Sequence, residues 1–176
     1  GEAAVENEVF YRANGFRLGD VVQSMTTYGG RGWIVVNNSQ VVFAIDLTNF
    51  REIGRIDRGL TSPRYIHFVS DEKAYITQLW DNRIAMESGS TEQMVSWGKY
   101  VICTCWSYQN RIIKIDTSAD RVVAEAEVGI QPNSIVLDAR GKLWVLTDGG
   151  YQGSPYGYEG ARLMRIDPAT LKIERT

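Results

Sequence analysis

The sequence predicts an all-β protein, and three observations lead to that prediction. Helical periodicity is nearly absent, because no window of about a dozen residues places apolar side chains at i, i+3, i+4 and i+7. Short runs rich in β-branched and aromatic residues recur at intervals of about ten residues, bounded by Gly, Asn, Asp and Pro. These runs also repeat one another's pattern. The predicted strands are 33–36, 41–45, 65–69, 100–105, 111–115, 134–137, 143–146 and 163–166.

Each repeat contains four strands, supported by aligned residues. Strand A follows an entry segment that begins with Pro63 in one unit and with Pro132 in another. Strand B follows a short turn, strand C ends in an Asp-led turn, and strand D completes the unit. The starts of strand B are Gly32, Lys73, Lys99 and Lys142, and the ends of strand C are Asp46, Asp116 and Asp167. A four-stranded unit of about 40–45 residues is typical of a β-propeller blade.

The repeats predict one partial propeller domain over 1–176. The expected blades are about 18–58, 59–85 (truncated), 86–128 and 129–176, preceded by a lone outer strand at 5–12. The second blade is about 15 residues too short for the repeat, since only 26 residues separate Lys73 from Lys99. We therefore expect residues to be missing between Ala85 and Met86, which an intact-mass measurement would test. An open arc leaves two sheet faces bare, so we expect a closed ring in a larger protein.

Composition argues against several classes of protein. Nineteen Lys and Arg against 21 Asp and Glu give a net charge of −2, which lacks the basic face that nucleic acids require. A single His argues against a His-based metal site or a Ser-His-Asp triad. Cys103 and Cys105 flank Thr104 on one strand, and we expect both thiols to be buried. We therefore expect no metal, no cofactor and no nucleic-acid partner.

One rim of the predicted propeller gathers aromatic residues. The loops between strands B and C emerge there, whereas the turns between strands A and B, at the other rim, are mostly small and charged. Flat aromatic rings among Asn, Gln and Ser suit a large, weakly charged ligand. The other interpretation is that the Trp rings pack between blades and the Tyr-rich loop covers a surface. The rim aromatics are Trp80, Trp106, Tyr108, Tyr151, Tyr156 and Tyr158.

Polar residues at the entries to strand A are expected at the same rim. The repeat aligns Arg64, Thr91 and Asn133, with Gln23 close to the same level. We expect this group to hydrogen-bond a ligand over the central channel, or else to brace neighbouring blades. The loop at 149–160 is about eight residues longer than its equivalents and carries a ligand contact, a partner contact or no function. The polar candidates are Arg64, Glu92, Gln93, Asn133 and Asp148.

Several segments resemble known surface proteins. Residues 112–123 and 129–145 resemble the forty-residue YVTN propeller repeats of bacterial surface proteins. Residues 61–68, 86–93, 105–111 and 147–158 are similar to the seven-bladed surface lipoproteins of Bacteroidetes that include the BtuG-type cobalamin-binding proteins. This resemblance covers nearly all of the chain. It implies seven blades and a place on the outer face of the outer membrane, with a lipid anchor outside this segment. It also implies capture of cobalamin or a related corrinoid such as cobinamide for a TonB-dependent transporter.

Two other functions stay open beside corrinoid capture. One is a propeller scaffold that recognises a protein and binds no small molecule. The other is an enzyme, a lyase or a quinone-dependent dehydrogenase, which needs a convergent base or metal ligands. We expect His67 to be a buried, hydrogen-bonded core residue, and the Asp residues that end strand C to form Asx turns. We therefore expect a binding protein that is not an enzyme.

Overall fold

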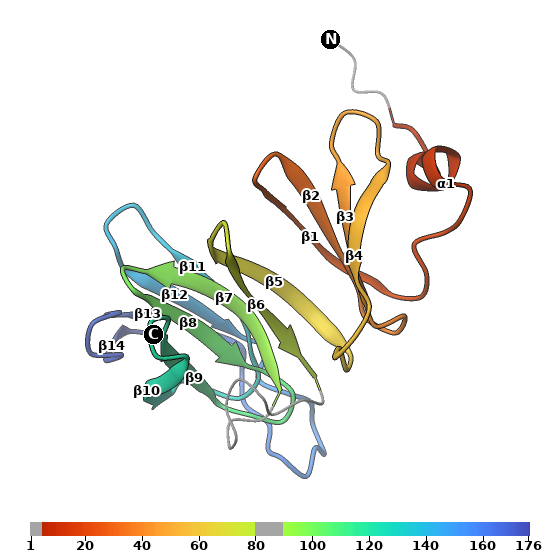
Figure 1. Ribbon diagram of the computed structural model, residues 1–176. Helices are drawn as coiled ribbons and strands as arrows, with labels where there is room; N and C mark the ends of the chain where they lie inside the picture. Colours follow the sequence, from red (N-terminus) through yellow and green to blue (C-terminus); the bar gives the residue numbers. More distant parts are fainter. Residues whose placement is uncertain (1–4, 80–89) are drawn as a thin grey trace.

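Four antiparallel sheets follow one another along the chain, arranged side by side like the blades of a propeller (Figure 1). The computed structural model describes residues 5–79 and 90–176. Within these ranges three sheets have four strands and one has two. The prediction of an all-β propeller with about four blades in this chain is confirmed. The expected total of seven blades, and the expected gap between Ala85 and Met86, lie outside what the described residues test.

Strand order within each sheet follows the chain, so each blade is built from consecutive hairpins. The first sheet contains β1 (Val22–Tyr28), β2 (Arg31–Val36), β3 (Val41–Asp46) and β4 (Glu52–Ile56). The second contains β5 (Pro63–Ser70) and β6 (Lys73–Gln78). The third contains β7 (Thr91–Trp97), β8 (Tyr100–Cys105), β9 (Arg111–Asp116) and β10 (Arg121–Glu127). The fourth contains β11 (Pro132–Leu137), β12 (Leu143–Thr147), β13 (Arg162–Ile166) and β14 (Ile173–Arg175).

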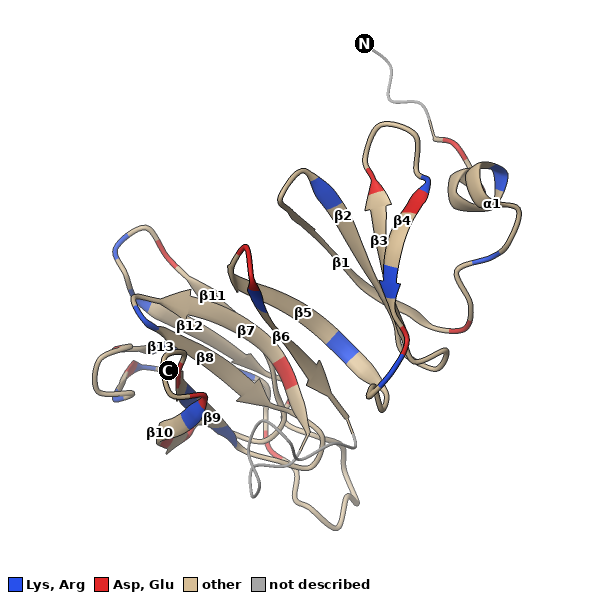
Figure 2. Ribbon diagram, in the orientation of Figure 1, with Lys and Arg blue, Asp and Glu red and all other residues tan. Residues whose placement is uncertain are grey.

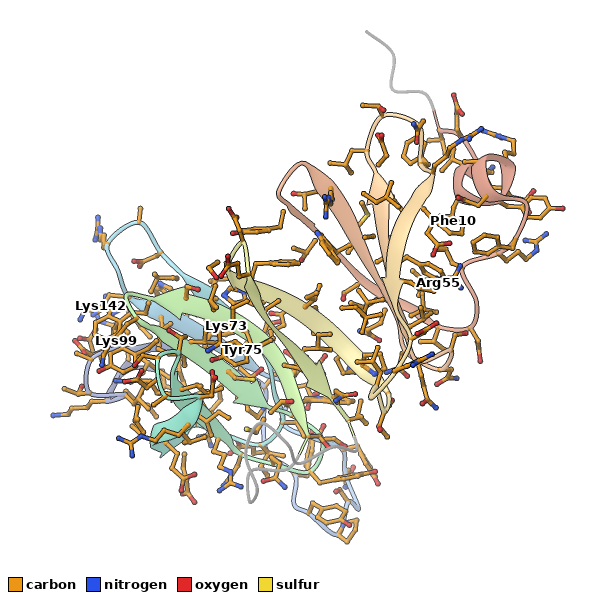
Figure 3. The ribbon with its side chains drawn as sticks, viewed as in Figure 1. Phe10, Arg55, Lys73, Tyr75, Lys99 and Lys142 are labelled. Atoms are coloured by element: carbon orange, nitrogen blue, oxygen red, sulfur yellow. The ribbon has the colours of Figure 1, made fainter. Side chains whose placement is uncertain are left out.

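The lone outer strand predicted at 5–12 is wrong, because helix α1 (Val9–Asn14) occupies the second half of this segment. The ring of Phe10 is buried against the first sheet, with its centroid 5.4 Å from that of Phe43 (Figure 3). The side chain of Asn14 donates to the carbonyl of Phe50 (2.9 Å) and accepts the amide of Glu52 (2.8 Å). The segment therefore covers the face of the sheet and fastens to the turn before β4, instead of extending the sheet at its edge.

The hydrophobic core lies between successive sheets. Ile102 and Ile112 of the third sheet pack with Leu143 and Val145 of the fourth. Cys103 and Cys105 are fully buried beside Tyr75, as the sequence predicts, and burial raises the pKa of both thiols, that of Cys105 to about 12.

His67 is hydrogen-bonded but only half-buried. Its Nε2 lies 2.7 Å from the hydroxyl of Ser96, and burial lowers the pKa of its imidazole. The expected hydrogen bond is thus present, whereas full burial is not. The register places His67 opposite Tyr75, on the inner strand of the second sheet, and its ring faces Ser96 of the third.

The three Asp residues that end strand C form Asx turns, as predicted. In each case one carboxylate oxygen accepts the backbone N–H two residues further on, from Thr48 (2.7 Å), Ser118 (2.9 Å) and Ala169 (2.8 Å). A Lys side chain donates to two of the three carboxylates, Lys99 to Asp116 (2.8 Å) and Lys142 to Asp167 (2.9 Å). These residues are structural because their oxygens are occupied by the turn.

Acid should weaken the fold through these turns. The hydrogen bond from Lys142 and those from the backbone lower the pKa of Asp167 to about 2, and similar bonds lower the pKa of Asp46 and Asp116. A carboxyl whose folded-state pKa is lowered contributes stability above its ordinary value near 3.8, and that contribution is lost as pH falls toward the folded-state value.

The melting temperature should therefore fall between pH 4 and pH 2, which thermal unfolding at a series of pH values would measure. In Asp167→Asn the same fall should be smaller. An identical pH profile for the variant and the parent chain would contradict this assignment.

Candidate ligand-binding rim

Four side chains lie at one level of the inner strands, at the entry to each sheet. Strands β1, β5, β7 and β11 are neighbours in that order. Each has a register irregularity directly after its first residue, and such β-bulges re-aim the side chain that they contain. The second residues of the four strands are Gln23, Arg64, Glu92 and Asn133. The sequence repeat placed Thr91 at this level, but the register pairs Thr91 with Cys105 and gives the position to Glu92.

A largely buried ion pair between Arg64 and Glu92, with a hydrogen bond to Gln23, joins three of these strands. The guanidinium of Arg64 donates from Nε and Nη2 to the two carboxylate oxygens of Glu92, at 2.7 Å each, and from Nη1 to Oε1 of Gln23 at 2.7 Å. The side chains of Arg64 and Glu92 are only 16% and 5% exposed. Burial raises the pKa of the Glu92 carboxyl, and Arg64 opposes that rise. The single basic band on β5 and the single acidic band on β7 mark this pair in Figure 2.

Buried Thr hydroxyls support two of the four bulges. The hydroxyl of Thr77 accepts the amide of Tyr65 (3.0 Å), and that of Thr104 accepts the amide of Gln93 (3.1 Å). Both amides follow directly after a residue of the ion pair, and both Thr side chains are fully buried. The hydroxyls replace ladder bonds that the bulges remove, so they hold Arg64 and Glu92 in register.

Trp106 lies between the ion pair and the fourth sheet. The guanidinium carbon of Arg64 is 5.3 Å from the centroid of the indole, within the range of a cation–π contact. The indole N–H donates to Oδ2 of Asp148 at 2.9 Å. Trp106 belongs to the loop after β8 and is thus held by Arg64 of the second sheet and by Asp148 of the loop after β12.

The long loop that follows β12 is tied to the body of the protein at its base. The second carboxylate oxygen of Asp148 accepts the amide of Gly150 (2.9 Å), and the amide of Glu159 donates to the carbonyl of Gly149 (2.9 Å). Gly149 has a φ of 79°, and a Cβ atom there would collide with the carbonyl oxygen of Glu159. This close approach requires glycine and explains one of the several glycines in the loop.

Four tyrosine rings remain exposed at this rim. The rings of Tyr108 and Tyr156 pack on each other, with centroids 4.2 Å apart, and so join the loop after β8 to the long loop. Tyr151 and Tyr158 are 55% and 60% exposed on the same long loop. Figure 1 shows both loops at the end of the arc where β8 and β12 finish. Of the predicted rim aromatics, only Trp80 lies outside the described residues.

The two remaining polar candidates differ in their contacts. The side-chain oxygen of Gln93 accepts the amide of Ile135 (3.1 Å), so it bridges the third and fourth sheets. The side-chain oxygen of Asn133 is buried and has no hydrogen-bond partner among the described residues. Arg64, Glu92 and Gln93 therefore brace neighbouring sheets, which was one of the two roles expected from the sequence. A direct contact between any of them and a ligand stays a prediction.

The opposite rim carries an aromatic cluster that the sequence reasoning missed. The rings of Tyr28 and Phe68 stack with centroids 4.3 Å apart, and Trp33 lies against Phe68. With Arg31 and Asp71 they line a hollow of about 340 Å³. These rings come from strand ends and not from the turns, which are small and charged as expected. The sequence contained one indication of this cluster, because Tyr28 and Trp33 lie on either side of the Gly29–Gly30 turn.

Comparisons with known proteins establish the fold. No protein-family model and no curated protein matches the chain. The WD40 β-propeller domain of Doa1 has a TM-score of 0.66 and 11% identity, over 88% of this chain and 52% of that one. Hydrazine synthase of Kuenenia stuttgartiensis has a TM-score of 0.65 and 16% identity, over 92% of this chain and 52% of that one. A Bacteroides caccae protein of unknown function has a TM-score of 0.63 and 10% identity, over 88% and 65%.

The chain is therefore a β-propeller segment that spans about half to two thirds of the length of these solved structures. Sequence identities this low support a shared fold and give no information about the ligand. In residues 5–79 and 90–176, no helix combines the length and the apolar character needed to cross a bilayer.

The ion pair makes a testable contribution to stability. Glu92→Gln should destabilise the chain by about 3 kcal/mol, because it leaves the buried Arg64 without its counter-charge. Replacing both partners, Arg64→Met with Glu92→Leu, should cost less than Glu92→Gln alone. Urea-induced unfolding would measure both, and a double variant less stable than the single one would contradict the assignment.

The hydroxyl of Thr104 offers an independent check on the bulge. Thr104→Val keeps the shape but leaves the amide of Gln93 without an acceptor, and should destabilise the chain by about 1–3 kcal/mol. Thr104→Ser keeps the hydroxyl and should cost about 1 kcal/mol for the lost methyl group. Thermal unfolding of the two variants would show this order, and a Val variant as stable as the parent would refute it.

Proposed function

We propose that this chain is part of a surface-exposed binding protein whose aromatic rim captures a large, flat organic ligand. The observation that carries the proposal is the gathering of four exposed tyrosine rings at one rim, on loops held in place by Asp148, Gly149 and the contact between the tilted rings of Tyr108 and Tyr156. Loops held in place before binding lose little conformational freedom when a ligand arrives, which favours affinity.

A corrinoid is the ligand that we infer. A corrinoid is broad and flat, and its edge carries amide groups that match the phenol hydroxyls and amide side chains of this rim. The resemblance to BtuG-type surface proteins supports cobalamin or cobinamide in particular. On that basis the protein would lie on the outer face of the outer membrane, held by a lipid anchor outside this segment. It would pass the ligand to a TonB-dependent transporter without any covalent chemistry.

A protein-recognition scaffold is the alternative. The WD40 propeller domain among the similar structures supports it at the level of fold, and exposed tyrosines also suit a protein interface. An enzyme would need a base that is available to a substrate. The buried carboxylate nearest the rim, that of Glu92, is already bound at both oxygens by Arg64, which argues against this role for Glu92.

Binding titrations would test the proposal. Tyr151→Ala and Tyr158→Ala should each weaken cobalamin binding about two- to tenfold, the effect expected for the loss of one aromatic contact. Their melting temperatures should stay close to that of the parent chain, because both rings are exposed. Tyr11→Ala is the matched control, since Tyr11 is a 42% exposed tyrosine on α1, and binding should be unchanged.

Calorimetry with cobalamin, cobinamide and haem separates the possible outcomes. Binding of the two corrinoids that depends on the tyrosines supports the proposal. Binding of haem alone would support the aromatic rim as a binding site and would reject a corrinoid as its ligand. No binding of any of the three, in a chain whose thermal unfolding is cooperative, would reject small-molecule capture and leave the scaffold.

A further inference from the structure

The hollow between the β1–β2 turn and the β5–β6 turn, here called the turn hollow, has walls that are already in place. Its volume of about 340 Å³ falls within the range of small-molecule pockets, about 300–1,000 Å³. The rings of Tyr28 and Phe68 are nearly parallel, and the indole N–H of Trp33 donates to the carbonyl of Tyr28 (3.3 Å). The lining residues are Tyr28, Gly29, Arg31, Trp33, Phe68 and Asp71.

A small residue keeps the turn hollow open. Two residues before the Asp that ends the third strand, the third sheet has Lys114 and the fourth has Arg165, whereas the first sheet has Ala44. In the third sheet, Nζ of Lys114 lies 5.3 Å from the ring centroid of Trp97 and donates to the carbonyl of Ala169 (2.6 Å). Ala44 is too short to cover the rings of the first sheet in this way, so those rings stay available to a ligand.

Two opposite charges line the turn hollow without forming an ion pair. Arg31 stands opposite Asp46 in the register, but Oδ2 of Asp46 accepts the side-chain amide of Asn49 (3.4 Å). Within residues 5–79 and 90–176, the side chain of Arg31 has no hydrogen bond and no ion pair. In the same ranges Asp71 accepts the hydroxyl of Tyr28 (2.9 Å) and has no ion pair. Figure 2 shows the basic start of β2 and the acidic β5–β6 turn at the same end of their sheets.

We propose that the turn hollow binds a free amino acid with an aromatic side chain. The α-carboxylate of this ligand pairs with the guanidinium of Arg31, and its α-ammonium pairs with the carboxylate of Asp71. Its ring lies against the indole of Trp33. A zwitterion neutralises both charges of the hollow at once, whereas a simple anion or a simple cation leaves one of them without a partner. The proposal is independent of the ligand at the tyrosine-bearing rim, because the two sites lie at opposite ends of the strands.

Nuclear magnetic resonance of the tryptophan indole N–H groups tests the location of binding. L-phenylalanine is the probe, and the signal of Trp33 is identified by its loss in Trp33→Phe. Millimolar L-phenylalanine should shift the Trp33 signal saturably and leave those of Trp106 and Trp144 in place. L-alanine, which lacks the ring, should bind at least about tenfold more weakly. An unchanged Trp33 signal, or a saturable shift of Trp106 instead, would refute the site.

Altered ligands and matched variants test the two charges by the same titration. L-phenylalaninamide lacks the carboxylate and N-acetyl-L-phenylalanine lacks the ammonium, so each should bind about two- to fivefold more weakly than L-phenylalanine. Arg31→Gln should abolish the preference over the amide, and Asp71→Asn the preference over the N-acetyl compound. Arg121→Gln and Glu72→Gln are the controls, because both residues are exposed and neither lines the hollow, and they should change nothing. Equal affinity of the parent chain for all three compounds, or preferences that survive in Arg31→Gln and Asp71→Asn, would overturn the proposal.

Discussion

Neighbouring sheets in this chain cover one another's apolar faces, and this packing shapes the rest of the structure. A four-stranded sheet cannot cover both of its faces alone, so sheets pack on one another in sequence. Strands β3 and β9 are therefore buried over nearly their whole length. The same packing encloses Arg64 between three inner strands, where little water reaches it. The guanidinium must then find acceptors from the protein, and Glu92 and Gln23 supply them.

The rim depends on this buried framework. Arg64 contacts the indole of Trp106, Trp106 donates to Asp148, and Asp148 begins the long loop and caps its first turn. A continuous set of contacts therefore runs from the buried ion pair to the exposed tyrosines. Loops on a rigid scaffold are the usual carriers of binding residues, because the scaffold fixes their position while the loops vary. In this chain the position of the rim loops therefore depends on how the sheets pack around the ion pair.

Within residues 5–79 and 90–176 the second sheet has two strands where the others have four, and its side chains tie it to the third sheet. Lys73 and Tyr75 of β6 reach the turn between β9 and β10, where Lys73 donates to the carbonyl of Thr117 and the hydroxyl of Tyr75 donates to the carboxylate of Asp120. Apolar side chains stay more than a third exposed on the outer strands of the first and third sheets, at Ile56 and Val123, and on the fourth sheet, at Leu146 and Leu163.

The sequence by itself determined the class of fold, the strand order within each blade and the Asx turns, because these follow from local alternation and from the short reach of an Asp side chain. It also located the aromatic loops, since one rim collects the connections between the second and third strands. Tertiary structure decided the rest. The helix at Val9–Asn14 depends on a sheet face that only packing creates. The pairing of Arg64 with Glu92 depends on a bulge that shifts the register by one residue, and such shifts arise from contacts between strands far apart in the chain.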